Sequence, residues 1–132
     1  MKNKDLQFNE KKLDDLASKY QLNYLVLFGS RANGSFGRDS DCDIAISSKK
    51  DLDFSSEFDI NERLSSIFKI KVDLINVAKA GPVLMKEITD NGKLIKEYTP
   101  NSYDRFEIFS FKNFVEARPL LRMKEEYIER NI

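Results

Sequence analysis

The stretch FGSRANGSFGRDSDCDI, residues 28–44, decides how this chain can fold and what it can bind. Gly29 and Ser30 follow a short continuous apolar run, which is typical of a buried strand. The glycine- and serine-rich residues that come next favour a helical turn and then a loop. Asp41 and Asp43 open a second strand. The stretch therefore predicts a tight turn, a hydroxyl and two carboxylates in one neighbourhood, and these groups suit a magnesium nucleotide.

The two aspartates are predicted to lie on one face of their strand. Side chains alternate across a strand, so Asp41 and Asp43 point the same way, with their α-carbons about 6–7 Å apart. The apolar side chains of Cys42, Ile44 and Ile46 point to the other face and can pack against helices. One face of this strand is therefore available for binding a polar ligand.

A third carboxylate, Asp73, stands in the strand predicted for residues 71–77, between Val72 and Leu74. A buried, unpaired aspartate would be costly, so Asp73 needs a partner. If its strand lies beside that of Asp41 and Asp43, the three acids can surround two metal ions. The alternative is a solvent-facing residue on an edge strand. The chain has no histidine and one cysteine, so oxygen ligands and Mg²⁺ or Mn²⁺ are expected.

The turn after the first strand carries the expected phosphate-binding groups. Gly29 allows the backbone to approach a phosphate closely. Ser30 offers its hydroxyl and backbone amide, and a helix that begins there would add partial positive charge. Arg31 is the nearest candidate for neutralising a triphosphate, with Arg38 in the following loop as a second.

Hydrophobic spacing and capping signals predict the remaining elements. Their expected ranges are a helix capped by Asn9, a helix over 53–68, a helix from Pro82 to residue 91, a short strand or turn over 93–98, and a C-terminal helix capped by Ser102. Pro119 predicts a kink or two consecutive helices. We expect Phe54, Phe58, Val83 and the Phe-rich stretch 106–114 to face the core, although an exposed aromatic stripe for a partner helix is the alternative for that stretch.

Composition limits the classes of function. The 132 residues suit one domain, and 22 basic against 22 acidic residues argue against gripping nucleic acid by bulk positive charge. One cysteine, Cys42, forms no intrachain disulfide and fits a reducing compartment. Residues 1–6 have no apolar signal-peptide core, and no run approaches the length of a membrane span. We therefore expect a cytoplasmic protein with neither membrane attachment nor direct nucleic-acid binding.

These motifs resemble the nucleotidyltransferase superfamily that includes DNA polymerase beta, and most of all its minimal MNT-type branch. The pattern is Gly29-Ser30, a spacer of about ten residues, Asp41-Cys42-Asp43, and Asp73 in a later strand. The match runs from about residue 22 to 77. It implies an α+β fold, a mixed sheet flanked by helices, in one domain over 1–132. The catalytic core would span about 22–80 and a C-terminal helical part about 82–132.

The resemblance also implies an activity. Asp41, Asp43 and Asp73 would bind two Mg²⁺ ions and catalyse transfer of AMP from ATP, while Gly29, Ser30 and Arg31 hold the nucleotide. The acceptor would be a hydroxyl, on a tyrosine, of a partner HEPN ribonuclease toxin, which makes this chain an antitoxin. Two alternatives stay open: an antitoxin that only masks the toxin by binding, and transfer of a nucleotide to a small molecule. Nucleotide preference, the number of AMP units and oligomeric state are not encoded in any motif.

Overall fold

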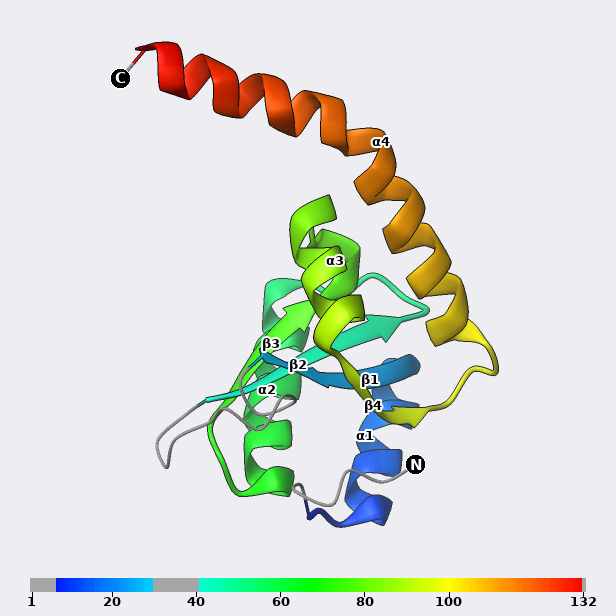
Figure 1. The fold of residues 1–132 in the computed structure, drawn as a ribbon. Helices are drawn as coiled ribbons and strands as arrows, with labels where there is room; N and C mark the ends of the chain where they lie inside the picture. The colour runs from blue at the N-terminus through cyan, green and yellow to red at the C-terminus, as the bar shows by residue number, and fades with distance from the viewer. Residues whose placement is uncertain (1–6, 30–40, 132) are drawn as a thin grey trace.

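The computed structural model describes residues 7–29 and 41–131, and places four strands and four α-helices in them (Figure 1). The elements in chain order are α1 (Glu10–Tyr20), β1 (Leu22–Phe28), β2 (Cys42–Ser48), α2 (Phe54–Phe68), β3 (Val72–Asn76), the 3-10 helix η2 (Val77–Lys79), α3 (Pro82–Asn91), β4 (Lys93–Glu97) and α4 (Ser102–Asn131). Each element predicted within these ranges is present, with its ends shifted by one or two residues in most cases, and the helical turn predicted at Ser30 lies outside the described residues. No helix in these described ranges is long and apolar enough to cross a membrane.

The strands form a mixed sheet in the order β3-β2-β1-β4. β1 lies antiparallel to both β2 and β4, whereas β2 and β3 are parallel. Parallel neighbours need a crossover, and α2 provides it between β2 and β3. The expected α+β fold with a mixed sheet and flanking helices is confirmed.

Helices cover both faces of the sheet (Figure 1). On one face, α1 and α2 pack on the side chains of Cys42, Ile44 and Ile46, as strand alternation predicts. On the other face, α3 and the first part of α4 pack on a second cluster that includes Tyr24 and Ala45. The sheet is therefore the middle layer of three.

The predicted capping residues fix where the helices begin. The side chain of Asn9 accepts a hydrogen bond from the Lys12 backbone N–H at 3.2 Å, and α1 begins at the next residue. Asp53 caps α2 in the same way, and Pro82 occupies the first turn of α3. Local chemistry thus determines these boundaries.

The C-terminal helix differs from its prediction at its first residue. Ser102 is the first helical residue, and its hydroxyl donates to the Thr99 carbonyl oxygen at 2.7 Å instead of capping the helix. Pro119 lies inside one continuous α4, so the prediction of a kinked helix agrees with the structure and the alternative of two consecutive helices does not. Figure 1 shows that α4 bends and that its distal part extends away from the sheet.

Several apolar side chains expected in the core are exposed. They are Phe54 and Phe58 on α2, Val83 on α3, and Phe109 and Phe111 on α4. The reason is helical geometry: at 3.6 residues per turn, Phe54 and Phe58 lie about 120–160° around α2 from Ile60. Ile60 marks the buried side of α2, and Phe106 is buried, so the prediction for the stretch 106–114 is correct in part.

Candidate active site

Strand register brings the motif residues of three strands side by side. Phe28, the last residue of β1, lies opposite Asp43 in the antiparallel β1–β2 pair, and Gly29 follows it directly. Asp43 in turn lies opposite Asp73 in the parallel β2–β3 pair. Residues that are far apart in sequence therefore meet at one end of the sheet.

Gly29 fits this place for two reasons. Its φ angle is +75°, in the left-handed region that side chains disfavour. A Cβ atom added at this position would lie only 2.3 Å from the Asp43 carboxylate oxygen Oδ2. The turn after β1 and the carboxylate on β2 thus occupy adjoining space, and only glycine allows both.

The Asp43 carboxyl has a raised pKa. Burial is the largest cause, followed by the negative charges of Asp73, Asp41 and Glu87 and by a side-chain hydrogen bond with Asp73. The carboxyls of Asp43 and Asp73 repel each other when both are ionised. A cation placed beside them would remove this repulsion.

Asp73 is exposed rather than buried, which corrects the expectation for a polar residue in an apolar strand. The strand β3 lies at the edge of the sheet, so one side of Asp73 is open to solvent. Its neighbour across the β2–β3 pair is Asp43, whose carboxyl pKa is raised in part by the negative charge of Asp73. The edge-strand alternative and the paired-acid hypothesis therefore both describe part of what is seen.

Asp41 lies two residues before Asp43, but its charge raises the pKa of Asp43 less than the charge of Asp73 does. It is exposed and lies 4.0 Å from the Lys71 ammonium. In residues 7–29 and 41–131, no three acidic, cysteine or histidine side chains are gathered so as to hold a metal ion. Asp43 and Asp73 lie side by side on neighbouring strands, and the full three-acid metal site stays a prediction. The donor chemistry fits Mg²⁺, because all three side chains offer carboxylate oxygens.

Ser30, Arg31 and Arg38, the remaining predicted nucleotide-binding residues, lie outside the described part of the chain. The structure therefore brings together Gly29, Asp43 and Asp73, with Asp41 at the rim.

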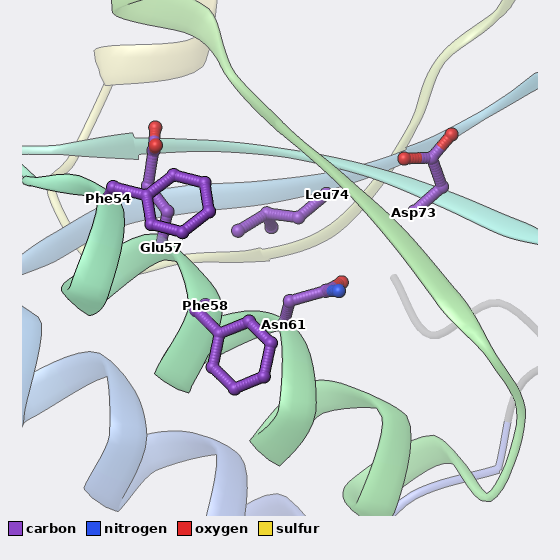
Figure 2. Close-up of a pocket in the computed structure, with 6 residues that line it drawn as sticks. All are labelled: Phe54, Glu57, Phe58, Asn61, Asp73 and Leu74. Atoms are coloured by element: carbon purple, nitrogen blue, oxygen red, sulfur yellow. The ribbon is translucent and has the colours of Figure 1, made fainter.

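A pocket beside Asp73 was not predicted from the sequence. It is lined by Phe54, Glu57, Phe58, Asn61, Asp73 and Leu74, and its volume is about 310 Å³ (Figure 2). The sequence could have indicated one wall of this pocket. At 3.6 residues per turn, Phe54, Phe58 and Asn61 share a face of α2 that lies about 100–160° around the helix from the buried Ile60. Glu87 on α3 was also missed, and no motif marks it.

Comparison with known proteins identifies a family. A sequence profile described as "Polymerase beta, Nucleotidyltransferase" matches residues 11–101, which include Gly29, Asp41, Asp43 and Asp73. The protein adenylyltransferase MntA of Shewanella oneidensis is 36% identical over 91 residues, which cover 66% of this chain and 64% of that protein. The MntA protein adenylyltransferase of Aphanizomenon flos-aquae is 30% identical over 118 residues, with 82% of this chain and 79% of that protein covered.

Solved structures show the same fold along most of the chain. A chain from a crystal structure of a toxin–antitoxin with AMP-PNP superimposes with a TM-score of 0.72 at 27% identity. The alignment covers 92% of this chain and 97% of the other, so it reaches well beyond the motif region.

Proposed function

Because this chain belongs to the polymerase beta nucleotidyltransferase family, we propose that it transfers AMP from ATP to a hydroxyl of a partner toxin and so acts as an antitoxin. Two MntA relatives that carry the name protein adenylyltransferase support the reaction. The similar chain in a toxin–antitoxin structure with AMP-PNP supports both the nucleotide and the partner. The partner class that the sequence resemblance implies is a HEPN ribonuclease, with a tyrosine as acceptor.

One observation carries this proposal: the register that places Asp73 opposite Asp43, with Gly29 against the Asp43 carboxylate. The acid pair offers oxygens that can hold a cation, and the adjoining turn at Gly29, which admits no side chain, lets the backbone come close to a phosphate group. This arrangement is specific to the fold, since neither a Gly-Ser turn nor an Asp-x-Asp pair alone would create it.

The residues have distinct proposed roles. Gly29, Ser30 and Arg31 hold the outer phosphates, and Asp73 takes the proton of the acceptor hydroxyl. The acceptor oxygen bonds to the α-phosphorus while the bond to the pyrophosphate oxygen breaks, and pyrophosphate leaves with its electrons. Asp41, Asp43 and Asp73 would hold Mg²⁺, which when bound neutralises charge on the phosphates and on the attacking oxygen. The buried Cys42 has no part in this chemistry and is consistent with a reducing compartment such as the cytoplasm.

The test uses α-labelled ATP, Mg²⁺ and the HEPN protein encoded beside this chain. We expect label on that protein with the wild type and a loss of about 100-fold or more with Asp43→Asn. Lys49→Ala, a change at an exposed residue after β2, is the matched control and keeps full activity. If the folded wild type transfers no label to this protein, the proposed reaction is wrong.

A second candidate is neutralisation by masking alone. The exposed apolar side chains along α4, among them Phe111, Leu120 and Tyr127, could cover part of the toxin without any transfer. The double variant Asp41→Ala, Asp43→Ala separates the two functions at equal abundance. If cells that carry this variant survive the toxin as well as wild-type cells do, masking is sufficient.

A further inference from the structure

The outer edge of β3 has a backbone pairing position that no described strand uses. The Cys42 N–H donates to the Lys71 carbonyl oxygen, so in this parallel pair the backbone groups of Asp73 and Ile75 face β2. The alternate residues of β3 then face outward. The N–H of Val72 is already bonded to the Ser65 hydroxyl at 3.0 Å. Within residues 7–29 and 41–131, no strand pairs with the outward-facing N–H and C=O of Leu74, so both can bond to a further strand.

The pocket of Figure 2 lies directly beside this edge. Its walls include the rings of Phe54, which is 81% exposed, and Phe58, which is 60% exposed. Large apolar groups in such a position gain stability when another surface covers them. The pocket thus has two aromatic rings in its wall and lies beside backbone that no strand of the described residues pairs.

The polar groups of the pocket show where a ligand can hydrogen-bond. Both carboxylate oxygens of Glu57 are engaged, one by the Asn76 amide at 3.1 Å and one by the Lys79 ammonium at 2.9 Å. The side-chain oxygen of Asn61 is buried and has no hydrogen-bond donor among the described residues. An acceptor of this kind is costly to leave unpaired, and it favours a ligand that brings a donor.

We propose that the acceptor segment of the partner protein binds here as an extended strand that pairs with Leu74 at the edge of β3. This proposal rests on the proposed function, and it adds where and in which conformation the acceptor is held. Main-chain hydrogen bonds supply affinity in this mode, and pockets for alternate side chains supply specificity. The outer edge of β3 and the α2 side chains of the pocket together form the binding site.

Because side chains alternate along a strand, two neighbouring residues of the partner would contact opposite faces of the sheet edge. Leu74 and Asp73 point to opposite faces of the sheet, since Leu74 packs with the α1–α2 cluster. A partner residue on the Leu74 face enters the pocket between Phe54, Phe58 and Asn61 as an apolar or aromatic anchor. The next residue along lies on the Asp73 face, where its hydroxyl meets the carboxylate that takes its proton. The acceptor tyrosine is therefore flanked by an anchor residue.

The kinetic test compares the double variant Phe54→Ala, Phe58→Ala with Val83→Ala. Phe54, Phe58 and Val83 are all exposed apolar residues, so neither variant empties the core. We expect the double variant to raise the KM for the partner about tenfold or more, with kcat and ATP affinity within about twofold of wild type. Val83→Ala leaves all three unchanged. Weaker ATP binding with an unchanged KM for the partner would show that the pocket holds the adenine base and would overturn the proposal. No change in either quantity would overturn it as well.

A second measurement does not depend on catalysis. Amide hydrogen exchange at Leu74 is expected to be fast in the isolated protein and at least about tenfold slower in the complex with the HEPN protein and a non-hydrolysable ATP analogue. Protection without AMP transfer would leave the docking site standing while the proposed reaction fails. If Leu74 exchanges equally fast in a stoichiometric complex, the acceptor does not pair with β3 and the inference is wrong.

Discussion

At the scale of single residues, the contact between Gly29 and Asp43 connects backbone conformation to chemistry. The left-handed φ of Gly29 and the missing Cβ are both required for the Asp43 carboxylate to lie where it does. A change at either position alters the other, because the two groups share the same space. The site is therefore sensitive to substitutions that leave every acid in place.

Gly29→Ala is expected to lower the free energy of unfolding by about 1–3 kcal/mol and to reduce AMP transfer at least tenfold. The cause is backbone strain combined with displacement of the Asp43 carboxylate. Chemical denaturation and the labelled-ATP assay measure the two effects. Gly81→Ala is the matched control, because nothing lies within 4 Å of a Cβ at that position and its φ is not left-handed. Equal behaviour of the two variants would contradict the close contact.

Asp43→Asn is expected to stabilise the metal-free protein while it inactivates the enzyme. The pKa of Asp43 is raised, first by burial and then by Asp73 and Asp41, so its ionised form opposes folding at neutral pH. The cost is present above the folded-state pKa and disappears as the pH falls below the unfolded value of about 3.9. Because the side chain is partly exposed, we expect a gain of less than about 1 kcal/mol near pH 7 and none near pH 3. Denaturation without Mg²⁺ at the two pH values checks this, and a loss of stability at neutral pH would be the opposite result.

At the scale of elements, one carboxylate on α1 bonds to the edge strand β4 and to the residue that follows it. The Asp14 carboxylate accepts hydrogen bonds from the Lys96 ammonium on β4 at 2.6 Å and from the Tyr98 hydroxyl at 2.7 Å. These bonds lower the pKa of Asp14, with Lys96 as the larger cause. The first helix and the last strand thus contribute to one polar contact although more than eighty residues separate them.

Asp14→Asn is expected to destabilise the protein at neutral pH by less than about 1 kcal/mol, because the contact is partly exposed. The pKa of Asp14 is lower in the folded than in the unfolded state. Its contribution is therefore complete above the unfolded value of about 3.9 and is lost as the pH falls through the folded-state value. Thermal denaturation across this range should show the variant and the wild type converging in acid. Asp15→Asn, one residue further along α1 and exposed, is the control that leaves the curve unchanged.

The elements themselves were largely predictable from the sequence, and the reasons are local. Asn9 and Asp53 cap helices through their own neighbours, and Cys42, Ile44 and Ile46 reveal by alternation which face is apolar. The exposure of Asp73 and of Phe58 was not predictable in this way. It depends on β3 being the outermost strand and on how α2 is rotated, and both follow from packing between distant segments.

At the scale of the whole molecule, α4 extends beyond the part that the sheet supports (Figure 1). Phe106 and Ser110 are buried near its start, whereas the apolar side chains of Leu120, Met123 and Tyr127 are exposed. The distal part contributes little to the core. Its role is expected to lie in contact with another protein.

Removal of residues 118–132 is expected to change the free energy of unfolding by less than about 0.5 kcal/mol, since nearly all the side chains described there are exposed. The same change should weaken association with the HEPN protein about tenfold or more. Calorimetric titration measures the second effect, and thermal denaturation the first. A truncated chain that binds with wild-type affinity would show that the distal helix is not part of the interface.

The motif stretch also predicted the catalytic neighbourhood only in part. Gly29 and Asp43 are near each other in the sequence pattern, and a family resemblance was enough to select Asp73. The pairing of Asp43 with Asp73 requires that β2 and β3 run parallel and in a specific register, which no local signal contains. The pocket beside β3 was not predictable for the same reason, because its walls come from both α2 and β3 and depend on how these two elements pack.

The outer edge of β3, which no strand in the described part of the chain pairs with, has a consequence for how this protein is made. A strand whose amides lack neighbours can be completed by any extended chain, including a second molecule of its own kind. Synthesis together with the cognate partner would cover this strand edge early, whereas overproduction of this chain alone would favour aggregation. Solubility during recombinant expression should therefore rise when the two are made in the same cell.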